Sequence, residues 1–573
     1  MVPVAVIAAS AVTALLLFVD GGDPKNQIEL IKTGLTVGAG TGGVVALVLT
    51  GRRQWSTEHD ATQRRLNELY VKAVEQLGSD KAAVRHGGLY ALERVAQDNP
   101  DQRQTVVNVL CAYLRTPFHV PGEPRPRRRP GIRRPLAPSP LHDRRAVSSA
   151  HGGCRELPAA AELEDGALQE QEVRLTAQRV LTTHLKPGDD PDHPADMFWA
   201  DIDLDLTGAA LVDLDLNDAQ LRTGNFNRAS FAKDAWFNGA SFAEDAWFNE
   251  ASFVGKAGFE KANFAKIAGF NEASFAEDAW FNEASFVGNV GFEKANFAKI
   301  AGFDRASFAG YAMFDEATFA GYARLGGASF AENALFNSAT FAGYARFDEA
   351  SFAGYAVFDQ AHFAEDARFN GAWFAVDADF EEASFVGNVR FAKASFAEAR
   401  FNGASFAGYA QFDQVTFAEE ARFNGANFTG SAGFDGAKFI RDARFNEANF
   451  AGYARFDRVT FAGKAGFSEV RFTGYASFNK ATFAGNAWFD EASFAGDAWF
   501  DEASFDGDAW FNETSFAGAA RFKETTFADD AWFDGATFNG GINMSGAQFK
   551  REVPDQMQSH VVPPEDDDEN GLG

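Results

Sequence analysis

The sequence predicts a mainly β protein in which a long solenoid of short strands follows an α-helical N-terminal part. The chain holds 61 Phe in 573 residues, and a large apolar residue, usually Phe, recurs from Phe231 to Phe549 at steps of five and six. Ala stands two residues before nearly every Phe, which is the alternation of a short strand. Gly, Asn, Asp, Glu or Ala follows the Phe, as is typical of a turn. Such a repeat is typical of proteins built by stacking one small unit.

The repeating unit has eleven residues. From Leu206 to Phe231 the apolar residues are five apart, and beyond Phe231 the steps alternate between six and five. One residue is missing from this pattern, because "FAEARF" at 396–401 has a step of five where "FAGYARF" at 341–347 has six. In a helix, with about 100° per residue, steps of 5 and 11 would put Phe about 140° and 20° around the cylinder from the first. A helical repeat is therefore rejected.

The stretch "FNEASFAEDAWFNEASF" at 270–286 illustrates the expected geometry. Its Phe residues should fill a core, and its Ala residues should line the core beside them. Ser274, Trp280 and Ser285 should face water, because they lie between an inward Ala and an inward Phe. Asp278 is the extra residue of the six-residue step, and we expect it to bulge at a corner.

Residues 1–53 predict a two-helix transmembrane hairpin. The segments 3–19 and 34–50 carry no charged residue, and each is about as long as a short spanning helix. Arg52 and Arg53 follow the second segment, so the positive-inside rule places both termini in the cytoplasm. A secretory signal is the alternative for the first segment, although it lacks a basic start.

Three glycines of the second segment, Gly34, Gly38 and Gly42, are four residues apart. They predict a small-residue stripe for helix packing or for a homo-oligomer, and the alternative is that Gly is simply common in membrane helices. We expect membrane lipid as a partner through residues 3–50. The expected location is the cell membrane, with two spans and a cytoplasmic repeat domain.

Residues 54–118 predict a small bundle of three amphipathic helices. Gly78 should end the first helix, Ser79 or Asp80 should cap the second, and Pro100 should separate the third.

Three further segments complete the expected organisation. Residues 119–161 read as a disordered Pro/Arg-rich linker, which could touch anionic lipid but is better interpreted as plain solvated chain. Residues 162–200 predict a helix and the N-terminal cap of the solenoid, which itself occupies 201–550. The acidic residues 551–573 predict a disordered tail.

Composition gives little indication of catalysis. The chain has 80 acidic and 52 basic residues, and 50 acidic and 27 basic residues fall in 201–550, so the solenoid carries most of the negative charge. Cys111 and Cys154 lie in dissimilar contexts, which argues against a disulfide framework and against a Cys-type zinc site. The acids of "DIDLDLTG" at 201–208 are better read as an outward strand face than as a calcium site. We expect no enzyme activity, no catalytic residue, no metal and no cofactor.

Outward aromatic side chains predict ladders, because residues 22 apart should meet in adjacent coils. The expected partner-binding residues are Trp488, Trp510 and Trp532 in one ladder, Trp499 on the opposite side, and the pairs Tyr322 with Tyr344 and Tyr453 with Tyr475. The functional interpretation is an aromatic strip that binds a protein. The structural alternative is that stacked aromatics only stabilise a β ladder.

The unit "A-x-F-x-x" resembles the pentapeptide-repeat family, and "AALVD", "AQLRT" and "ASFAK" fit its pattern. The resemblance covers roughly 204–549 and implies a right-handed, quadrilateral, parallel β-helix. Two eleven-residue units would then make one coil of 22 residues with sides of 5, 6, 5 and 6, or about sixteen coils. The segments 73–115, 172–185 and 198–209 also resemble actinobacterial membrane-associated pentapeptide-repeat proteins.

The leading functional expectation is a membrane-anchored scaffold whose acidic rod binds an unknown protein. The alternative, implied by the family resemblance, is a DNA-mimicking rod that occupies a type II topoisomerase, although a membrane tether would keep it from the nucleoid. Direct binding of nucleic acid is not expected for an acidic chain. An enzyme that uses the rod as a scaffold is the third and weakest hypothesis.

Overall fold

The computed structural model describes residues 24–121, 160–188 and 193–555, together with positions 10, 13, 190, 557 and 558. Met1–Asp98 and Asn99–Gly573 form two compact units, each considered by itself. The predicted span at 3–19 lies outside the described residues except for Ser10 and Thr13.

The first unit contains two helices, α2 (Pro24–Leu77) and α3 (Ala82–Asp98). The turn between them is as predicted: Gly78 follows the last residue of α2, and the hydroxyl of Ser79 accepts a hydrogen bond from the backbone N–H of Lys81 at 3.2 Å. The helices approach closely at Gly88, where a Cβ would lie 2.8 Å from the backbone oxygen of Ala73.

The N-terminal helices differ from the expected transmembrane hairpin. The predicted span at 34–50 is part of α2, which continues through Arg52 and Arg53 without a break. Residues 51–56, "GRRQWS", contain no Pro, and Arg and Gln are good helix formers. Among the described residues, no helix combines the length and the apolar character needed to cross a membrane. Gly34, Gly38 and Gly42 lie within α2, and their packing role stays a prediction.

The second unit begins with a 3₁₀ turn (Pro100–Gln102), α4 (Arg103–Leu114) and α5 (Ala160–His184). The prediction of one three-helix bundle is wrong in its grouping, because α4 belongs to the unit that holds the rod and packs on its first strand. Val106, Val107 and Leu110 of α4 are fully buried, which explains why an apolar helix stays with the rod.

The first coil is capped by α4, by α5 and by the chain after α4. Val120, assigned to the disordered linker, is instead buried against Val212 and Ala232. Its apolar side chain covers the open end of the solenoid, whereas residues 122–159 of the predicted linker lie outside the described part. The prediction that 162–200 caps the rod is confirmed, since α5 packs on the second strand and Trp199 is completely buried.

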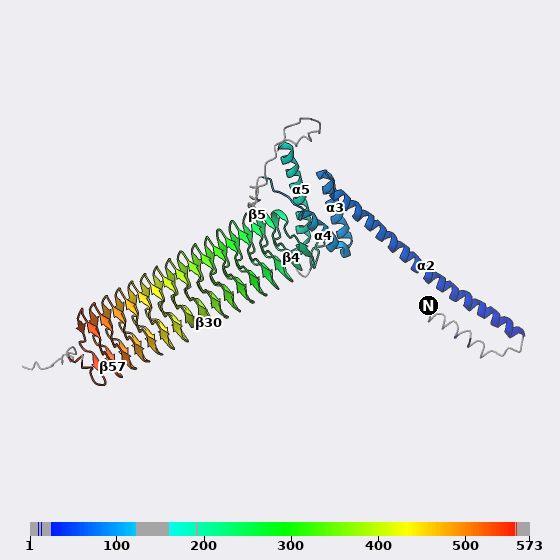
Figure 1. The fold of residues 1–573 in the computed structure, drawn as a ribbon. Helices are drawn as coiled ribbons and strands as arrows, with labels where there is room; N and C mark the ends of the chain where they lie inside the picture. Colours follow the sequence, from blue (N-terminus) through cyan, green and yellow to red (C-terminus); the bar gives the residue numbers. More distant parts are fainter. Residues whose placement is uncertain are drawn as a thin grey trace, which may run out of the picture. The chain divides into compact units, whose positions relative to one another are not determined.

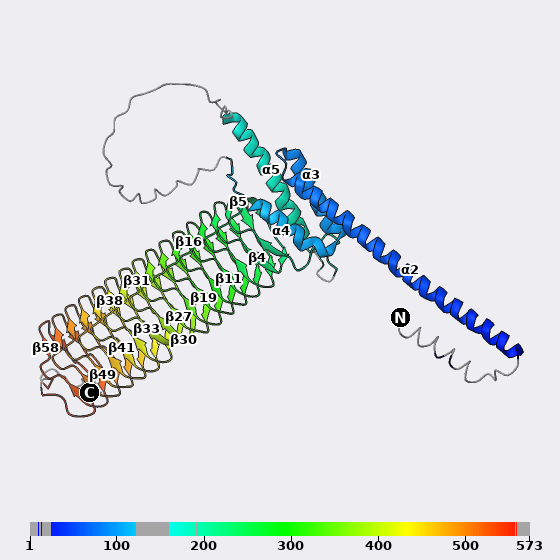
Figure 2. The same cartoon turned by 45° about the vertical axis from the view of Figure 1, so that its right-hand side comes forward.

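The rod consists of two parallel sheets of 30 strands each, which run from β1 (Asp203–Asp205) to β60 (Gln548–Phe549). The longer strands are β2 (Ala210–Asp215), β4 (Thr223–Asn225), β5 (Ser230–Trp236), β30 (Trp373–Asp379) and β33 (Ser395–Arg400). All others have two residues, either the Phe with the residue before it or the Ala with the residue after it. Figure 1 and Figure 2 show the coils stacked along one axis.

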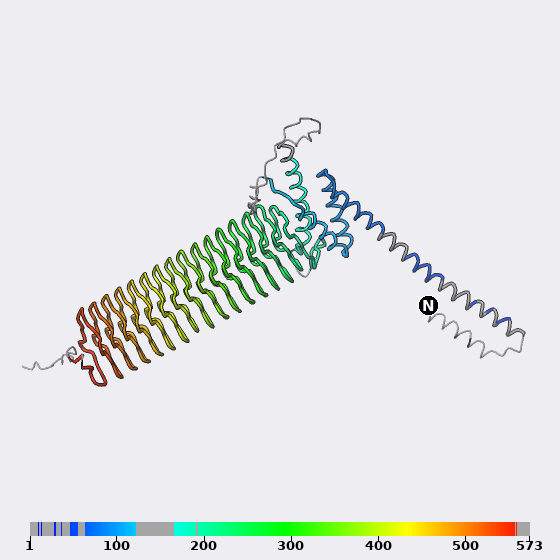
Figure 3. The backbone as a smooth tube through the Cα atoms, viewed as in Figure 1, coloured from blue at the N-terminus to red at the C-terminus, as the bar shows by residue number. Residues whose placement is uncertain are grey.

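Each strand pairs with the strand four positions on, so one coil has four strands. Phe264 of β10 (Asn263–Phe264) lies beside Phe286 of β14 (Ser285–Phe286), which confirms a repeat of 22 residues. About sixteen coils follow, as predicted, and Figure 3 shows their regular spacing. The first coils are shorter, because Asp203 pairs with Thr223. The right-handed sense of the coil stays a prediction.

Alternate corners of the coil differ, as the five-and-six pattern predicts. At one kind of corner two residues form a turn, and the second of them has a positive φ, such as 58° at Glu272 and 57° at Glu283. At the other kind three residues form a bend, such as 276–278. The predicted bulge at Asp278 is instead a wider bend, because Ala279 stays in register with Ala301 one coil on. Each sheet folds around one of these bends.

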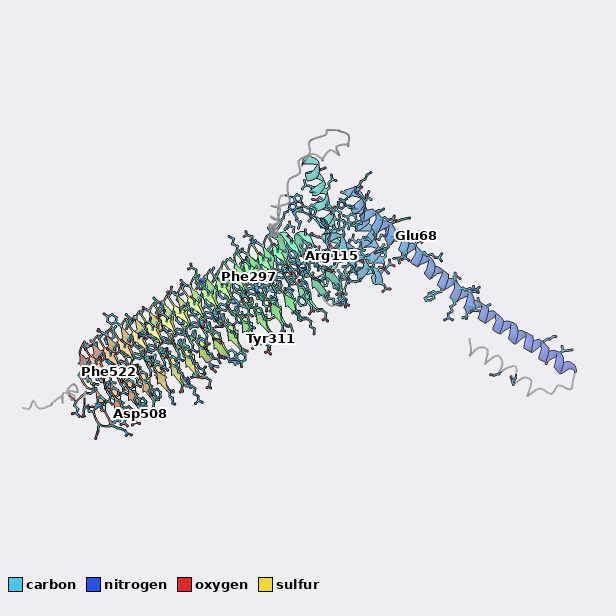
Figure 4. The ribbon with its side chains drawn as sticks, in the orientation of Figure 1. Glu68, Arg115, Phe297, Tyr311, Asp508 and Phe522 are labelled. Carbon is cyan, nitrogen blue, oxygen red and sulfur yellow. The ribbon has the colours of Figure 1, made fainter. Side chains whose placement is uncertain are left out.

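The core consists of four columns of stacked Phe rings. Phe248 and Phe270 are parallel with centroids 4.8 Å apart, and Phe259 meets Phe270 edge-on at 5.4 Å and 88°. These offsets and edge contacts are the favourable arrangements of aromatic rings. Figure 4 marks Phe297 and Phe522 among the completely buried side chains, and Tyr311 at the outer surface, where it is 43% exposed.

The end of the rod also differs from the prediction. Met557, assigned to the disordered tail, is buried. An apolar side chain at this position can cover the last coil, whose Phe538 and Phe549 are half-buried, so the ordered chain continues past 550. Residues 559–573 lie outside the described part.

Candidate functional site: the outward side-chain ladders

The predicted tryptophan ladder is confirmed. Trp488, Trp510 and Trp532 occupy β49 (Ala487–Trp488), β53 (Ala509–Trp510) and β57 (Ala531–Trp532), which are neighbours in one sheet. The ring centroids are 5.0 Å apart for the first pair and 4.8 Å for the second, with nearly parallel planes. The ammonium of Lys464 lies 5.9 Å from the Trp488 ring, as in a cation–π contact.

The tyrosine pairs meet as predicted but are not stacked. Tyr322 and Tyr344 have centroids 5.1 Å apart at 77°, and Tyr453 and Tyr475 have centroids 6.3 Å apart at 78°, so both pairs are edge-to-face. The reason is their position. Each tyrosine is the last residue of a three-residue bend, where successive rings fan around the corner instead of lying flat on a strand.

Trp499 lies in β51 (Ala498–Trp499) of the other sheet, on the side opposite the tryptophan ladder as predicted. There it meets a predicted tyrosine pair, since the Tyr475 ring is 6.0 Å away and tilted by 32°. The Arg521 guanidinium is 5.7 Å from the Trp499 ring. We call Tyr453, Tyr475, Trp499 and Arg521 the tyrosine–tryptophan cluster. Tyr475 is 53% exposed, whereas burial raises the pKa of Tyr453.

A column of glycines runs beside these tyrosines, one position before each. A Cβ at Gly452 would lie 2.6 Å from the backbone of Gly430, and one at Gly474 would lie 2.3 Å from the backbone oxygen of Gly452. The backbones of successive coils touch here, so only glycine fits. The recurring "AGY" and "TGY" motifs therefore place an aromatic ring beside a strip that has no side chains.

Arginine ladders are a feature that the sequence reasoning missed. Arg324, Arg346, Arg368 and Arg390 are register neighbours in the same sheet as Trp499. Like charges directly opposite would repel, and acids of the next turn neutralise them. Asp348 contacts Arg346 at 3.2 Å and Arg368 at 3.1 Å. The 22-residue spacing of these arginines was visible in the sequence and could have revealed the ladder.

The turn acids were read as a solvated face, and this interpretation is wrong for the Asn and Asp residues. The Oδ1 of Asn249 accepts a hydrogen bond at 2.9 Å from the backbone N–H of Asn271, whose Oδ1 accepts one from Glu293 at 3.1 Å. Asp278 makes the corresponding bond at the bend, to Ile300 at 3.4 Å. Asn and Asp have the short side chain that reaches this donor one coil on, so these residues hold the corners together.

Other acids fall where the outward-face interpretation puts them. Asp203 pairs with Arg222, and Asp205 pairs with Arg115 and accepts hydrogen bonds from Thr207. Among the described residues, the three carboxylates close enough to share a metal ion are those of Asp508, Asp529 and Asp530. Arg551 is bound to two of them, at 2.7 Å and 3.5 Å, which neutralises that cluster.

The comparison with protein families finds the model described as pentapeptide repeats (9 copies) at residues 259–307, 325–395 and 412–548. The rod is therefore a pentapeptide-repeat β-helix. No curated protein matches the chain. No solved structure matches it either.

Proposed function

We propose that the rod is a scaffold that binds a protein partner through the tyrosine–tryptophan cluster. The observation that carries the proposal is that Tyr475, Trp499 and Arg521 lie together on one exposed face. Tyr, Trp and Arg are the residues most enriched in the energetic centres of protein interfaces. Beside them the glycine column gives the partner a flat backbone surface without side chains to displace.

The charge pattern around the cluster suits this role. Although the rod is acidic, Arg455 pairs with Asp435 at 2.6 Å and Arg521 pairs with Asp501. Paired charges are partly desolvated already, so a partner that covers them loses less hydration free energy than it would over isolated charges. The tryptophan ladder on the opposite face offers a second surface of the same kind.

The test is a cross-linked pull-down from membranes with the full chain and with a Tyr475→Ser, Trp499→Ser double variant. The double variant should lose the partner, because it removes the large rings and keeps the core Phe columns. A matched control carries Tyr322→Ser and Trp236→Ser, which change the same residue types on the same sheet, nearer the first coil. Loss of the partner only from the control would refute the assignment.

Attachment to membrane lipid through residues 3–50, with the repeat domain cytoplasmic, belongs to this proposal. Its support is that Leu47, Val48 and Leu49 are exposed on α2 and that Arg52 and Arg53 follow them. The test is alkaline extraction of cell membranes. We expect the full chain in the pellet, and a chain that starts at residue 54 in the supernatant. Recovery of both chains in the supernatant would contradict lipid attachment.

A DNA mimic that binds a type II topoisomerase is the second candidate, and the rod's excess of 50 acidic over 27 basic residues favours it. The arginine ladders weigh against it, because they place paired charges along the face of a sheet. A supercoiling assay with the full chain decides between the two. Inhibition at micromolar concentration would favour the mimic, and unchanged supercoiling would exclude it.

A further inference from the structure

One coil in the regular part of the rod is a residue shorter than its neighbours. Where β33 pairs with β30, Phe396 lies beside Phe374, 22 residues away, but Glu398 lies beside Asp377, only 21 away. The register shifts between these two pairs, at the bend that joins the two arms of the sheet. This is the unit "FAEARF", which the sequence shows to lack one residue.

The shift removes a hydrogen bond that regular coils make at this bend. Elsewhere in the same column the side-chain oxygen of the last bend residue accepts the backbone N–H one coil on, as in Asn289 to Tyr311 at 3.0 Å and Asp442 to Lys464 at 3.0 Å. The Oδ1 of Asp377 is buried and has no hydrogen-bond partner. The residue is 8% exposed, so water does not replace the missing donor.

The other carboxylate oxygen of Asp377 lies 2.6 Å from the Arg400 guanidinium. The same Arg400 also serves Glu398 at 3.4 Å and Asp379 at 4.0 Å, so one cation is shared by three acids. From the following coil, Arg422 approaches Glu398 at 3.5 Å and contacts Glu420. In the preceding coil, β27 (Ala356–Val357) adds no charge, and the residue before it is Tyr355.

We propose that β30 and β33 form a pH-sensitive joint in the rod, at which protonation of Asp377 holds the two coils together more firmly. The physical reason is the bare, buried carboxylate oxygen, which costs free energy while it is charged. Burial, opposed by Arg400 and reinforced by Glu398 and Asp379, raises the pKa of Asp377 to about 6. Tyr355, Trp373 and Val376 are exposed beside the joint, so a change there alters the outer surface of the rod.

The sign of the effect follows from this raised pKa. The closed joint binds a proton that an opened joint releases, because an exposed Asp titrates near pH 3.9. The stabilisation by the proton is therefore complete below about pH 4 and is lost as the pH rises to about 6. We expect the joint to open about ten times more often at pH 7.5 than at pH 5.

Hydrogen exchange measured by mass spectrometry on the full chain tests the proposal. Protection factors of peptides that cover 373–379 and 395–400 should fall about tenfold from pH 5 to pH 7.5, relative to peptides that cover the regular bend at 439–444. Equal protection at both values would overturn the proposal. Asp377→Asn, which is neutral throughout, should remove the pH dependence, and a persistent dependence in this variant would also overturn it.

A second pair of variants tests the cause. Insertion of one Gly between Ala397 and Glu398 restores the 22-residue coil and should abolish the pH dependence, while Asp442→Asn, at the same position of a regular coil, should leave it unchanged. If the insertion variant folds and keeps the full dependence, the missing residue is not its origin and the proposal fails. If that variant does not fold, the Asp377→Asn result decides.

Discussion

The side-chain amide of Gln178 makes both backbone hydrogen bonds of Val212. Its Nε2 donates to the Val212 oxygen at 2.8 Å, and its Oε1 accepts from the Val212 N–H at 3.1 Å. Gln104 treats Asp203 in the same way, at 2.9 Å for both bonds. Each glutamine thus takes the place of a strand that would precede the first coil, and the pair closes an edge that could otherwise recruit another chain.

Gln178→Ala should destabilise the start of the rod. The substitution leaves a buried donor and a buried acceptor of Val212 without partners, at a cost of about 1–3 kcal/mol for each. Hydrogen exchange of residues 203–236 should speed up, whereas exchange near 439–444 should not change. Gln169→Ala, on the exposed side of α5, is the matched control and should have no effect. Unchanged exchange in the Gln178 variant would refute the capping role.

Gly452→Ala should destabilise the rod by about 1–3 kcal/mol, because its Cβ would lie 2.6 Å from the Gly430 backbone and two rigid coils would have to separate. Gly166→Ala is the control, since a Cβ at that position of α5 meets nothing within 4 Å. The control should be neutral or slightly stabilising. Calorimetry compares the two variants, and an equal melting temperature for both would contradict the close approach.

Phe270→Ala should cost about 3–5 kcal/mol, because a buried aromatic side chain is removed from a column in which the rings of Phe248 and Phe292 flank it. Phe270→Leu should cost less, since the rod already accommodates Leu325 in a core position. Denaturant unfolding monitored by circular dichroism ranks the three proteins. A leucine variant as unstable as the alanine variant would show that ring stacking, and not apolar volume, dominates.

Cys111 should be inert in the folded chain. It is 1% exposed, and burial raises the pKa of its thiol to about 12, so almost no thiolate exists at pH 8. In a Cys154→Ser variant, alkylation at pH 8 should be more than about a hundredfold slower than in denaturant. The raised pKa costs no stability until the pH exceeds about 9, where an unfolded thiol ionises first. Fast labelling of native protein would contradict this burial.

Much of the rod could be predicted from its sequence, because inward positions obey a strict rule. Phe270 and Ala279 report their own burial through their type and spacing, so the 22-residue coil, the missing residue near Phe396 and the tryptophan ladder followed directly. Position alone did not give ring orientation. Tyr322 and Tyr344 meet edge-to-face because they lie on a bend, and a residue count does not distinguish a bend from a strand.

Polar roles were harder to predict than core positions. Asn249 and Asp278 look like ordinary turn residues, and only the coil above reveals that each accepts a backbone hydrogen bond. Gln104 and Gln178 carry no local signal at all, because their backbone partners at 203 and 212 are far away in sequence. Asp377 became visible as a special site only when the register shift was combined with the burial of its carboxylate.

Because every regular coil bonds only to the coil before and the coil after it, the number of coils is free to change. The glutamine pair contacts the first coil alone, and Met557 lies beyond the last, so a duplication of 22 residues between them would lengthen the rod without disturbing either end. The gene for such a protein can therefore act as a ruler that evolution extends or shortens one notch at a time.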